Sequence, residues 1–234
     1  MPMPSQKSRP LLLGHRGACK DAPENTVTAF ELALTHGADG FELDVRRTED
    51  GQLAVTHDPA LHGFVVAETP FKKLLNYSHY AIPTLPDVLE RYRQRAFLDI
   101  ELKVAGMEAE VIRLLKQFPP MKGVLVSSFL PEVVEALAKI SEEYPLGYIC
   151  KRPSEVNRWK QLPISHAVLH YNVVPDALID ELAAAGKKLI VWTVNDELEL
   201  KRFAGLGVDG IISDDTRLMC RAVGGISVTA AASP

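Results

Sequence analysis

The stretch 39-DGFELDVRRTEDGQLAVTHD-58 joins a predicted buried strand to a second strand that runs back alongside it. Its first half is rich in apolar and β-branched residues, but Glu42 and Asp44 interrupt it two positions apart. Alternate residues of a strand point to the same side, so both carboxylates are expected to face one small space. An Asp-Gly pair at positions 50 and 51 is typical of a hairpin turn, and the returning strand carries His57 toward the same end. An exposed hairpin whose Glu and Asp face water would show the same alternation. This stretch alone therefore does not distinguish a buried carboxylate pair from an exposed hairpin.

On either side of this stretch, short apolar runs alternate with segments of helical periodicity. Strands are predicted at 11–14, 41–45, 96–102, 123–126, 146–150, 166–169, 189–193 and 208–212, and helices at 24–36, 84–93, 107–118, 131–140, 154–160, 175–185, 197–206 and 216–223. Strict alternation of this kind indicates parallel strands. Eight strand–helix units in 234 residues predict an α/β fold of the (β/α)8 TIM-barrel type. An open doubly wound sheet is disfavoured, because no dinucleotide-binding or P-loop glycine motif follows any strand.

The predicted organisation is one domain with flexible ends. We expect a flexible N-terminus at 1–9, a single barrel domain at 10–223 and a flexible, small-residue tail at 224–234. A small insertion, at about 46–83, follows the second strand and is expected to be irregular, with one helical turn near Lys72.

Composition excludes several classes of protein. The 26 Lys and Arg residues against 30 Asp and Glu residues give a net charge of −4, so a nucleic-acid partner is not expected. Three widely spaced cysteines fit a reducing compartment better than a disulfide framework. With no apolar leader and no run long enough to cross a bilayer, we expect a cytoplasmic protein without an integral membrane segment. The oligomeric state is not indicated.

Polar residues gather where the predicted strands end, which is where (β/α)8 barrels place their active sites. In chain order these are His15-Arg16, Glu42 with Asp44, Glu101 with Lys103, Ser127-Ser128, Lys151, His170, Trp192-Thr193 with Asn195, and Ser213-Asp214. A random surface would scatter such residues over both ends of the barrel. This regularity favours a functional site over an exposed hairpin.

Glu42, Asp44 and Glu101 form a candidate metal site, since they offer oxygen ligands without cysteine. A set of carboxylates suits a hard divalent cation such as Mg²⁺ or Ca²⁺ better than zinc.

Four basic residues accompany these carboxylates at the same end of the predicted barrel. Arg16 and Lys103 would hold a phosphate and stabilise charge developing on its oxygens. His15 and His57 can supply a base for the attacking oxygen and an acid for the leaving oxygen, because histidine titrates near neutrality. The residues alone therefore predict a metal-assisted phosphoryl site.

The same residues occur in motifs that resemble one enzyme family. The motifs, in order, are His15-Arg16-Gly17, Pro23-Glu24-Asn25-Thr26, Glu42-Leu43-Asp44-Val45, His57-Asp58-Pro59, Glu101-Leu102-Lys103, Ser127-Ser128-Phe129, Val191 to Asn195 and Gly207 to Asp214. Together, from residue 11 to about 219, they resemble the glycerophosphodiester phosphodiesterase family. Each motif is weak by itself, but the full order is highly specific.

The resemblance implies a TIM barrel that hydrolyses glycerophosphodiesters to an alcohol and sn-glycerol 3-phosphate with a divalent cation. In this family pattern Glu42, Asp44 and Glu101 match the metal ligands, His15 and His57 the acid/base pair, and Arg16 and Lys103 the phosphate-binding positions. Glu24 matches a position that orders the site loop, and Trp192 one that lines the glycerol pocket. A small-molecule glycerophosphodiester is the implied substrate.

One segment departs from the family pattern. After His57-Asp58-Pro59 the family usually continues through an Arg and paired Thr residues, whereas residues 60–66 here read ALHGFVV. This shorter, more apolar segment favours the hypothesis that bulkier or lipid-like leaving groups are accepted, as in a lysophospholipase D-like phosphodiesterase. A metal-dependent lyase or aldolase barrel is the alternative from another class, but it does not need two histidines beside an Arg/Lys phosphate pair. A non-catalytic barrel would be expected to have lost part of the polar set.

Overall fold

The structure is a computed structural model that describes residues 9–119 and 121–224. The ends predicted to be flexible, at 1–9 and 224–234, lie outside the described residues except for Arg9 and Gly224. Arg9 is held in place, because its guanidinium donates to both carboxylate oxygens of Asp39 at 2.6 and 2.9 Å. In the described part of the chain, no helix combines the length and the apolar character needed to cross a membrane.

The described residues form a closed barrel of eight parallel strands, which confirms the predicted (β/α)8 TIM-barrel fold. The strands are β1 Leu11–Gly14, β2 Gly40–Arg47, β6 Phe97–Leu102, β7 Gly123–Ser128, β8 Leu146–Cys150, β9 His166–His170, β10 Lys188–Trp192 and β11 Gly210–Ser213. Each strand pairs with its neighbour in chain order, and β1 pairs with both β2 and β11 to close the ring.

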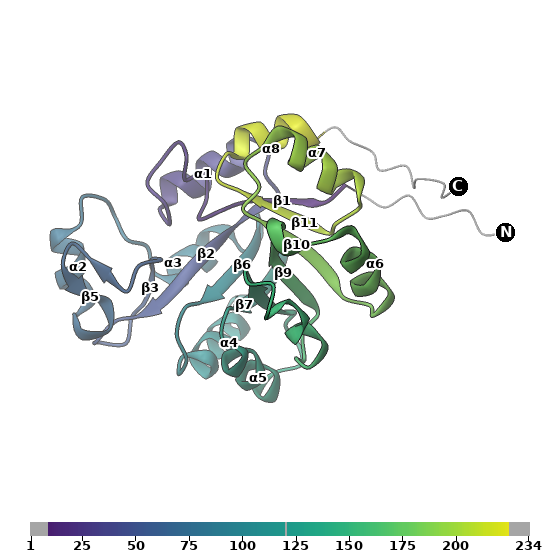
Figure 1. The fold of residues 1–234 in the computed structure, drawn as a ribbon. Helices are drawn as coiled ribbons and strands as arrows, with labels where there is room; N and C mark the ends of the chain where they lie inside the picture. The colour runs from purple at the N-terminus through teal and green to yellow at the C-terminus, as the bar shows by residue number, and fades with distance from the viewer. Residues whose placement is uncertain (1–8, 120, 225–234) are drawn as a thin grey trace, which may run out of the picture.

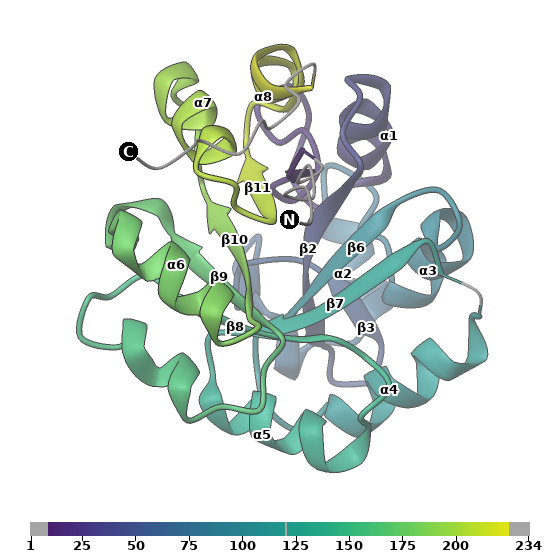
Figure 2. The ribbon, with the colours of Figure 1, turned by 90° about the vertical axis from the view of Figure 1, so that its right-hand side faces the viewer.

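Helices surround the barrel (Figure 2). They are α1 Val27–Thr35, α3 Leu85–Tyr92, α4 Glu108–Gln117, α5 Pro131–Ile140, α6 Asp176–Ala184, α7 Glu197–Gly205 and α8 Thr216–Val223. Each turns an apolar stripe toward the strands; in α4 the stripe consists of Val111, Ile112 and Leu115, all buried. Burial of such stripes is the main stabilising contribution in a barrel of this kind.

Two predicted helices differ from the structure. The first was expected from residue 24 but begins at Val27, since Thr26 caps it by accepting from the Ala29 amide, and Asn25 has a left-handed φ of 57°. The segment expected as a helix at 154–160 is instead a 3₁₀ helix, η2 Val156–Lys160. Its hydrogen bonds span three residues, as between the Gln161 amide and the Arg158 carbonyl, a pattern typical of short connectors.

The predicted hairpin is present, and the insertion after it is more ordered than expected. Strand β3 Leu53–Val55 pairs antiparallel with the end of β2. The insertion then contains β4 Ala60–Leu61, β5 Phe64–Val65, η1 Val66–Glu68 and the two-turn helix α2 Phe71–Tyr77. Val66, Leu74 and Ile82 give it a small core of its own with Ala54. It projects beside the barrel at the end where β2 finishes (Figure 1).

The interior of the barrel contains a cluster of buried apolar side chains. Its members are Leu13, Leu125, Ile149, Val168, Ile190 and Ile212, each from a different strand. Ile149, Val168 and Ile212 also form the floor of a cavity whose other walls are mostly polar. This apolar cluster therefore closes the barrel beneath the cavity, and the polar side chains lie at the carboxyl ends of the strands.

Candidate active site

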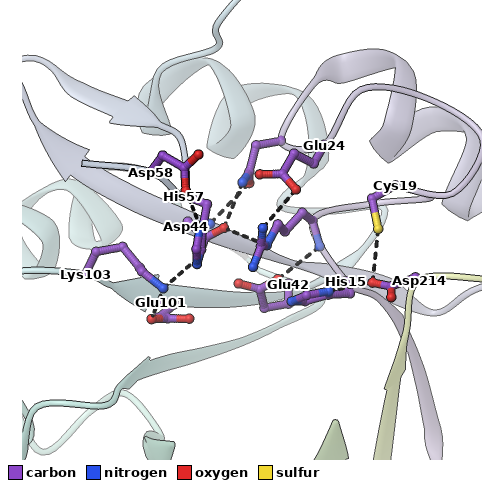
Figure 3. Close-up of polar contacts among 12 residues, drawn as sticks. His15, Cys19, Glu24, Glu42, Asp44, His57, Asp58, Glu101, Lys103 and Asp214 are labelled. Atoms are coloured by element: carbon purple, nitrogen blue, oxygen red, sulfur yellow. Dashed lines mark hydrogen bonds and ion pairs between the residues drawn. The ribbon is translucent and has the colours of Figure 1, made fainter. Parts of the chain in front are cut away.

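The register of two neighbouring strands places four acidic side chains together. In the pairing of β2 with β6, Glu42 lies opposite Asp99 and Asp44 lies opposite Glu101. All four are buried, with at most 6% of the residue exposed. One carboxylate oxygen from each of Glu42, Asp44 and Glu101 lies within 4.8 Å of the others, so the structure brings the predicted metal ligands together (Figure 3).

The two predicted phosphate-binding cations contact this cluster directly. Lys103 Nζ lies 2.6 Å from Glu101 Oε1 and 3.3 Å from Asp44 Oδ1. Arg16 donates its backbone N–H to Glu42 Oε2 at 2.9 Å, and its Nε lies 3.2 Å from Asp44 Oδ2. These contacts fix the two cations beside the carboxylates before any substrate is present.

Burial and mutual repulsion govern the ionisation of the carboxylates. Burial, followed by repulsion from Asp44 and Glu101, raises the pKa of Glu42 well above its ordinary value. Burial and the Asp44 charge raise the pKa of Glu101 to about 7, with Lys103 acting in the opposite direction. For Asp44 the burial effect is outweighed by Lys103, Arg16 and a hydrogen bond from Asn25, so its pKa lies below the ordinary value.

The cluster fits a divalent cation. In the described part of the chain, Glu42 Oε1 is buried and has no hydrogen-bond partner. A buried carboxylate oxygen is costly unless a cation or donor compensates it. An oxygen-only set of three carboxylates is the chemistry that Mg²⁺ and Ca²⁺ prefer.

Each predicted histidine has a carboxylate at its Nδ1. His15 Nδ1 lies 2.6 Å from Asp214 Oδ1, and His57 Nδ1 lies 2.8 Å from Asp58 Oδ1. Asn195 Nδ2 in turn donates to Asp214 Oδ2 at 2.6 Å, which fixes the orientation of that carboxylate. A carboxylate at Nδ1 favours a proton on that nitrogen and leaves Nε2 free for a reacting group. Burial lowers the pKa of His57, with the Asp44 and Asp58 carboxylates acting in the opposite direction, and this favours the neutral imidazole.

These groups share a cavity of about 430 Å³ at the mouth of the barrel. Of the predicted site residues, those that line it are His15, Arg16, Glu42, His57, Glu101, Lys103 and Trp192. Asp44 lies behind them and contacts the cavity through its two cations. Glu24 is outside the lining, where its Oε2 accepts from Arg16 Nη1 at 2.8 Å.

Trp192 forms an aromatic wall of the cavity. Its indole N–H donates to the Val168 carbonyl at 3.2 Å, and its ring lies edge-to-face with Phe129 at a centroid distance of 5.5 Å. Both aromatic rings line the cavity. They therefore give it an apolar side next to the charged groups.

Sequence reasoning assigned no role to several residues that the structure places in or beside the site. Asp99 lines the cavity, and burial raises its pKa to about 7 even though Ser127 Oγ donates to it at 2.6 Å. Asn25 holds Asp44 through paired hydrogen bonds, a contact that the Pro-Glu-Asn-Thr motif does not reveal. From the sequence, Asp214 was identified only as a polar residue at the end of a predicted strand. Its contact with His15 spans 199 positions, so no local pattern could indicate it.

The fold and site define the class: a (β/α)8-barrel hydrolase with a carboxylate cluster, an Arg/Lys pair and two histidines around one cavity. The sequence model of the glycerophosphoryl diester phosphodiesterase family matches residues 15–218, nearly the whole described chain. The chain belongs to this family and is a phosphodiesterase of that class. Family membership leaves the lyase or aldolase alternative without support.

Individual relatives agree with the family assignment. A glycerophosphodiester phosphodiesterase from Caldanaerobacter subterraneus subsp. tengcongensis is 34% identical over 91% of this chain and 97% of its own. The structure of a Thermotoga maritima glycerophosphodiester phosphodiesterase is 25% identical with a TM-score of 0.78, covering 91% of this chain and 97% of that one. An Oleispira antarctica phosphodiesterase, solved with the product sn-glycerol-3-phosphate, is 27% identical with a TM-score of 0.79, covering 92% and 96%.

Proposed function

We propose that this protein hydrolyses glycerophosphodiesters to an alcohol and sn-glycerol 3-phosphate with the help of Mg²⁺ or Ca²⁺. One observation carries the proposal: a cluster of three carboxylates lies in and directly behind the wall of one cavity that two cations and two histidines also line. The product held by the Oleispira antarctica relative supports the same reaction.

Glu42, Asp44 and Glu101 are the residues proposed to hold the cation, because their oxygens are close enough to share one ion. When bound, the cation would neutralise charge on the phosphate oxygens. Arg16 and Lys103 pair with two of the same carboxylates, Asp44 and Glu101, and would lie beside the bound cation.

Arg16 and Lys103 are proposed to bind the phosphate. Glu24 holds the Arg16 guanidinium at Nη1, and Glu101 holds Lys103, so neither cation has to be ordered when substrate arrives. Donors fixed in advance stabilise a developing charge more than mobile ones, because no reorganisation is needed at the moment of reaction. The contact with Arg16 supports a site-ordering role for Glu24.

His57 and His15 are proposed to move the protons. Neutral His57 can accept the proton of the attacking oxygen through Nε2. Asp214 stabilises a positive charge on His15, so His15 is suited to donate a proton to the leaving oxygen. Trp192 is proposed to pack against the carbon skeleton of the glycerol, because it supplies the apolar wall of the cavity.

A lysophospholipase D-like preference is the second candidate, favoured by the insertion. Val65, Leu75 and Tyr77 of the insertion are exposed at 43, 39 and 55%. The insertion projects at the end of the barrel where β2 finishes (Figure 1), so exposed apolar side chains on it could accept an acyl chain of the leaving group. The reaction at phosphorus would be the same, and only the alcohol would differ.

The first experiment is release of glycerol 3-phosphate from glycerophosphocholine, with EDTA and with added Mg²⁺ or Ca²⁺. We expect cation-dependent release by the wild type and none by Glu42→Ala. Glu108→Ala is the matched control, since it removes a buried glutamate that does not line the cavity. Release that survives EDTA would contradict the proposal. A much higher rate with lysophosphatidylcholine than with glycerophosphocholine would establish the second candidate instead.

A further inference from the structure

A second group of metal-binding side chains lies beside the candidate active site. His15, Cys19 and Asp214 bring a nitrogen, a sulfur and an oxygen within 4.8 Å of one another, on the side of His15 away from Lys103 and Glu101 (Figure 3). Both His15 Nδ1 and Cys19 Sγ approach the same atom, Asp214 Oδ1, at 2.6 and 3.1 Å. Within residues 9–119 and 121–224, this and the three-carboxylate cluster are the two groups with such geometry.

We propose that His15, Cys19 and Asp214 form an inhibitory site for a thiophilic transition-metal ion, of which Zn²⁺ is the main candidate. Binding there would use the imidazole of His15 as a ligand and so remove it from proton transfer. The inhibition rests on the proposed function of His15, whereas the metal site itself does not.

The donor types separate this site from the three-carboxylate cluster. Zinc prefers His nitrogen and Cys sulfur with tetrahedral coordination, and three protein ligands with one open position are common for it. Mg²⁺ and Ca²⁺ prefer oxygen and bind thiolates poorly. The two clusters are therefore expected to take different ions from the same solution.

The surroundings also favour a cation. Burial is the largest cause that raises the pKa of the Cys19 thiol, followed by its hydrogen bond to Asp214 and the charges of Asp214 and Glu24, with Arg16 acting in the opposite direction. The charges of Asp214 and Glu24 also attract a metal ion, which can replace the thiol proton. The side chains of His15 and Asp214 are 17 and 34% exposed, so an ion can reach the site from solvent.

The binding step is balanced as a proton exchange. The metal bonds to Cys19 sulfur as the S–H bond breaks, and that proton passes to solvent. His15 binds the metal through the Nδ1 lone pair and keeps one proton on Nε2: a neutral ring moves its proton from Nδ1 to Nε2, and a protonated ring releases its Nδ1 proton to solvent. Nε2 then carries a proton while Nδ1 is occupied, so His15 can no longer cycle between acid and base. One proton is released from Cys19 for each ion bound, and a second is released when His15 starts in its protonated form.

The test uses Co²⁺ as a spectroscopic substitute for zinc, with the full-length protein saturated with Mg²⁺. A cobalt–thiolate charge-transfer band at one Co²⁺ per chain is expected in the wild type and in Cys220→Ser, the matched control. Cys19→Ser and Cys19→Ala are expected to lose the band, and thermal unfolding shows whether both variants fold. Absence of the band from the wild type, or its survival in the Cys19 variants, would overturn the site. This readout does not depend on catalysis.

The second arm measures inhibition by Zn²⁺ of glycerophosphocholine hydrolysis, with each variant normalised to its own zinc-free rate. Loss of one ligand is expected to raise the Zn²⁺ concentration for half-inhibition by about 10-fold or more. Equal inhibition of the wild type and the Cys19 variants would mean that zinc acts by displacing the activating cation, and would overturn the inhibitory role. If zinc-free hydrolysis itself is absent, the proposed function fails while the cobalt experiment still decides the site.

Discussion

Replacing Glu42 by Gln should stabilise the metal-free protein while removing its response to a divalent cation. Glu42 is buried beside Asp44 and Glu101, and its pKa is raised by burial and by their charges. Without a cation the Glu42 carboxylate therefore destabilises the folded state. With a cation it becomes a ligand, so the sign of its contribution to stability changes.

The size of this destabilisation follows from two limiting cases, in which Glu42 is either protonated or ionised. Keeping the Glu42 carboxyl protonated at pH 7 costs 1.36 × (7 − 4.5), or about 3 kcal/mol, relative to its ordinary value of 4.5. Keeping it ionised leaves like charges within 4.8 Å, which costs about 3 kcal/mol per pair at an effective dielectric constant of 20, before Arg16 and Lys103 offset it. Allowing for the burial of the new amide, Glu42→Gln should gain roughly 1–3 kcal/mol, or roughly 2–12 °C in Tm for a chain of this size.

The assay is thermal unfolding of the wild type and Glu42→Gln, in EDTA and at a cation concentration of 100 Kd. Wild type should gain about 2.7 kcal/mol from the cation, and the variant almost none. In EDTA the advantage of the variant should shrink between pH 7 and pH 5. A raised carboxyl pKa costs stability as the pH rises above the ordinary value, so lowering the pH relieves the wild type.

Asp99→Asn is the control, because Asp99 is buried opposite Glu42 but lies outside the three-carboxylate cluster. It should keep the cation-dependent gain. The reasoning is refuted if Glu42→Gln is destabilised in EDTA, or if its Tm still rises with Mg²⁺ or Ca²⁺ as much as that of the wild type.

Three further predictions concern other residues. Burial lowers the pKa of His166 to about 4, so the unfolded chain takes up a proton below pH 6.5 that the folded protein resists, and stability falls by up to about 3 kcal/mol as the pH drops from 6.5 to 4. In His166→Gln this part of the pH dependence should be absent from denaturant unfolding curves, and an unchanged slope would contradict the assignment. Asp214→Asn should lower kcat on the order of 100-fold with little change in KM, because His15 loses the carboxylate charge that stabilises its protonated form. Equal kcat values for the wild type and Asp214→Asn would exclude this role of Asp214. Lys103→Met should bind the divalent cation more tightly, because a competing charge 2.6 Å from Glu101 is removed, but it should hydrolyse substrate more slowly. Calorimetry measures the cation affinity, and kcat/KM measures the loss of hydrolysis. Weaker cation binding would refute the argument.

Much of the fold was predictable because its causes are local. The alternation of apolar runs with helical periodicity indicated the eight strand–helix units, and the Asp-Gly turn indicated the hairpin. The start of the first helix was predicted too early, because Asn25 lies before α1 and its side chain donates a hydrogen bond to Asp44 in the site. The insertion was underestimated, since its small core joins residues from Ala54 to Ile82 that show no clear period in sequence. The cytoplasmic location, the absence of a nucleic-acid partner and the proposed domain boundaries stay predictions.

The sequence by itself determined the chemical inventory: which carboxylates, cations and histidines stand at strand ends, and hence the family and the class of reaction. It could do so because strand periodicity and barrel topology send those ends to one place. Only the tertiary structure decided how the groups combine. The pairing of Glu42 with Asp99 depends on the register between β2 and β6, and the pairing of His15 with Asp214 and Cys19 depends on closure of the barrel between β1 and β11. Such contacts join residues far apart in the chain, and their protonation depends on burial, which exists only once the chain has folded.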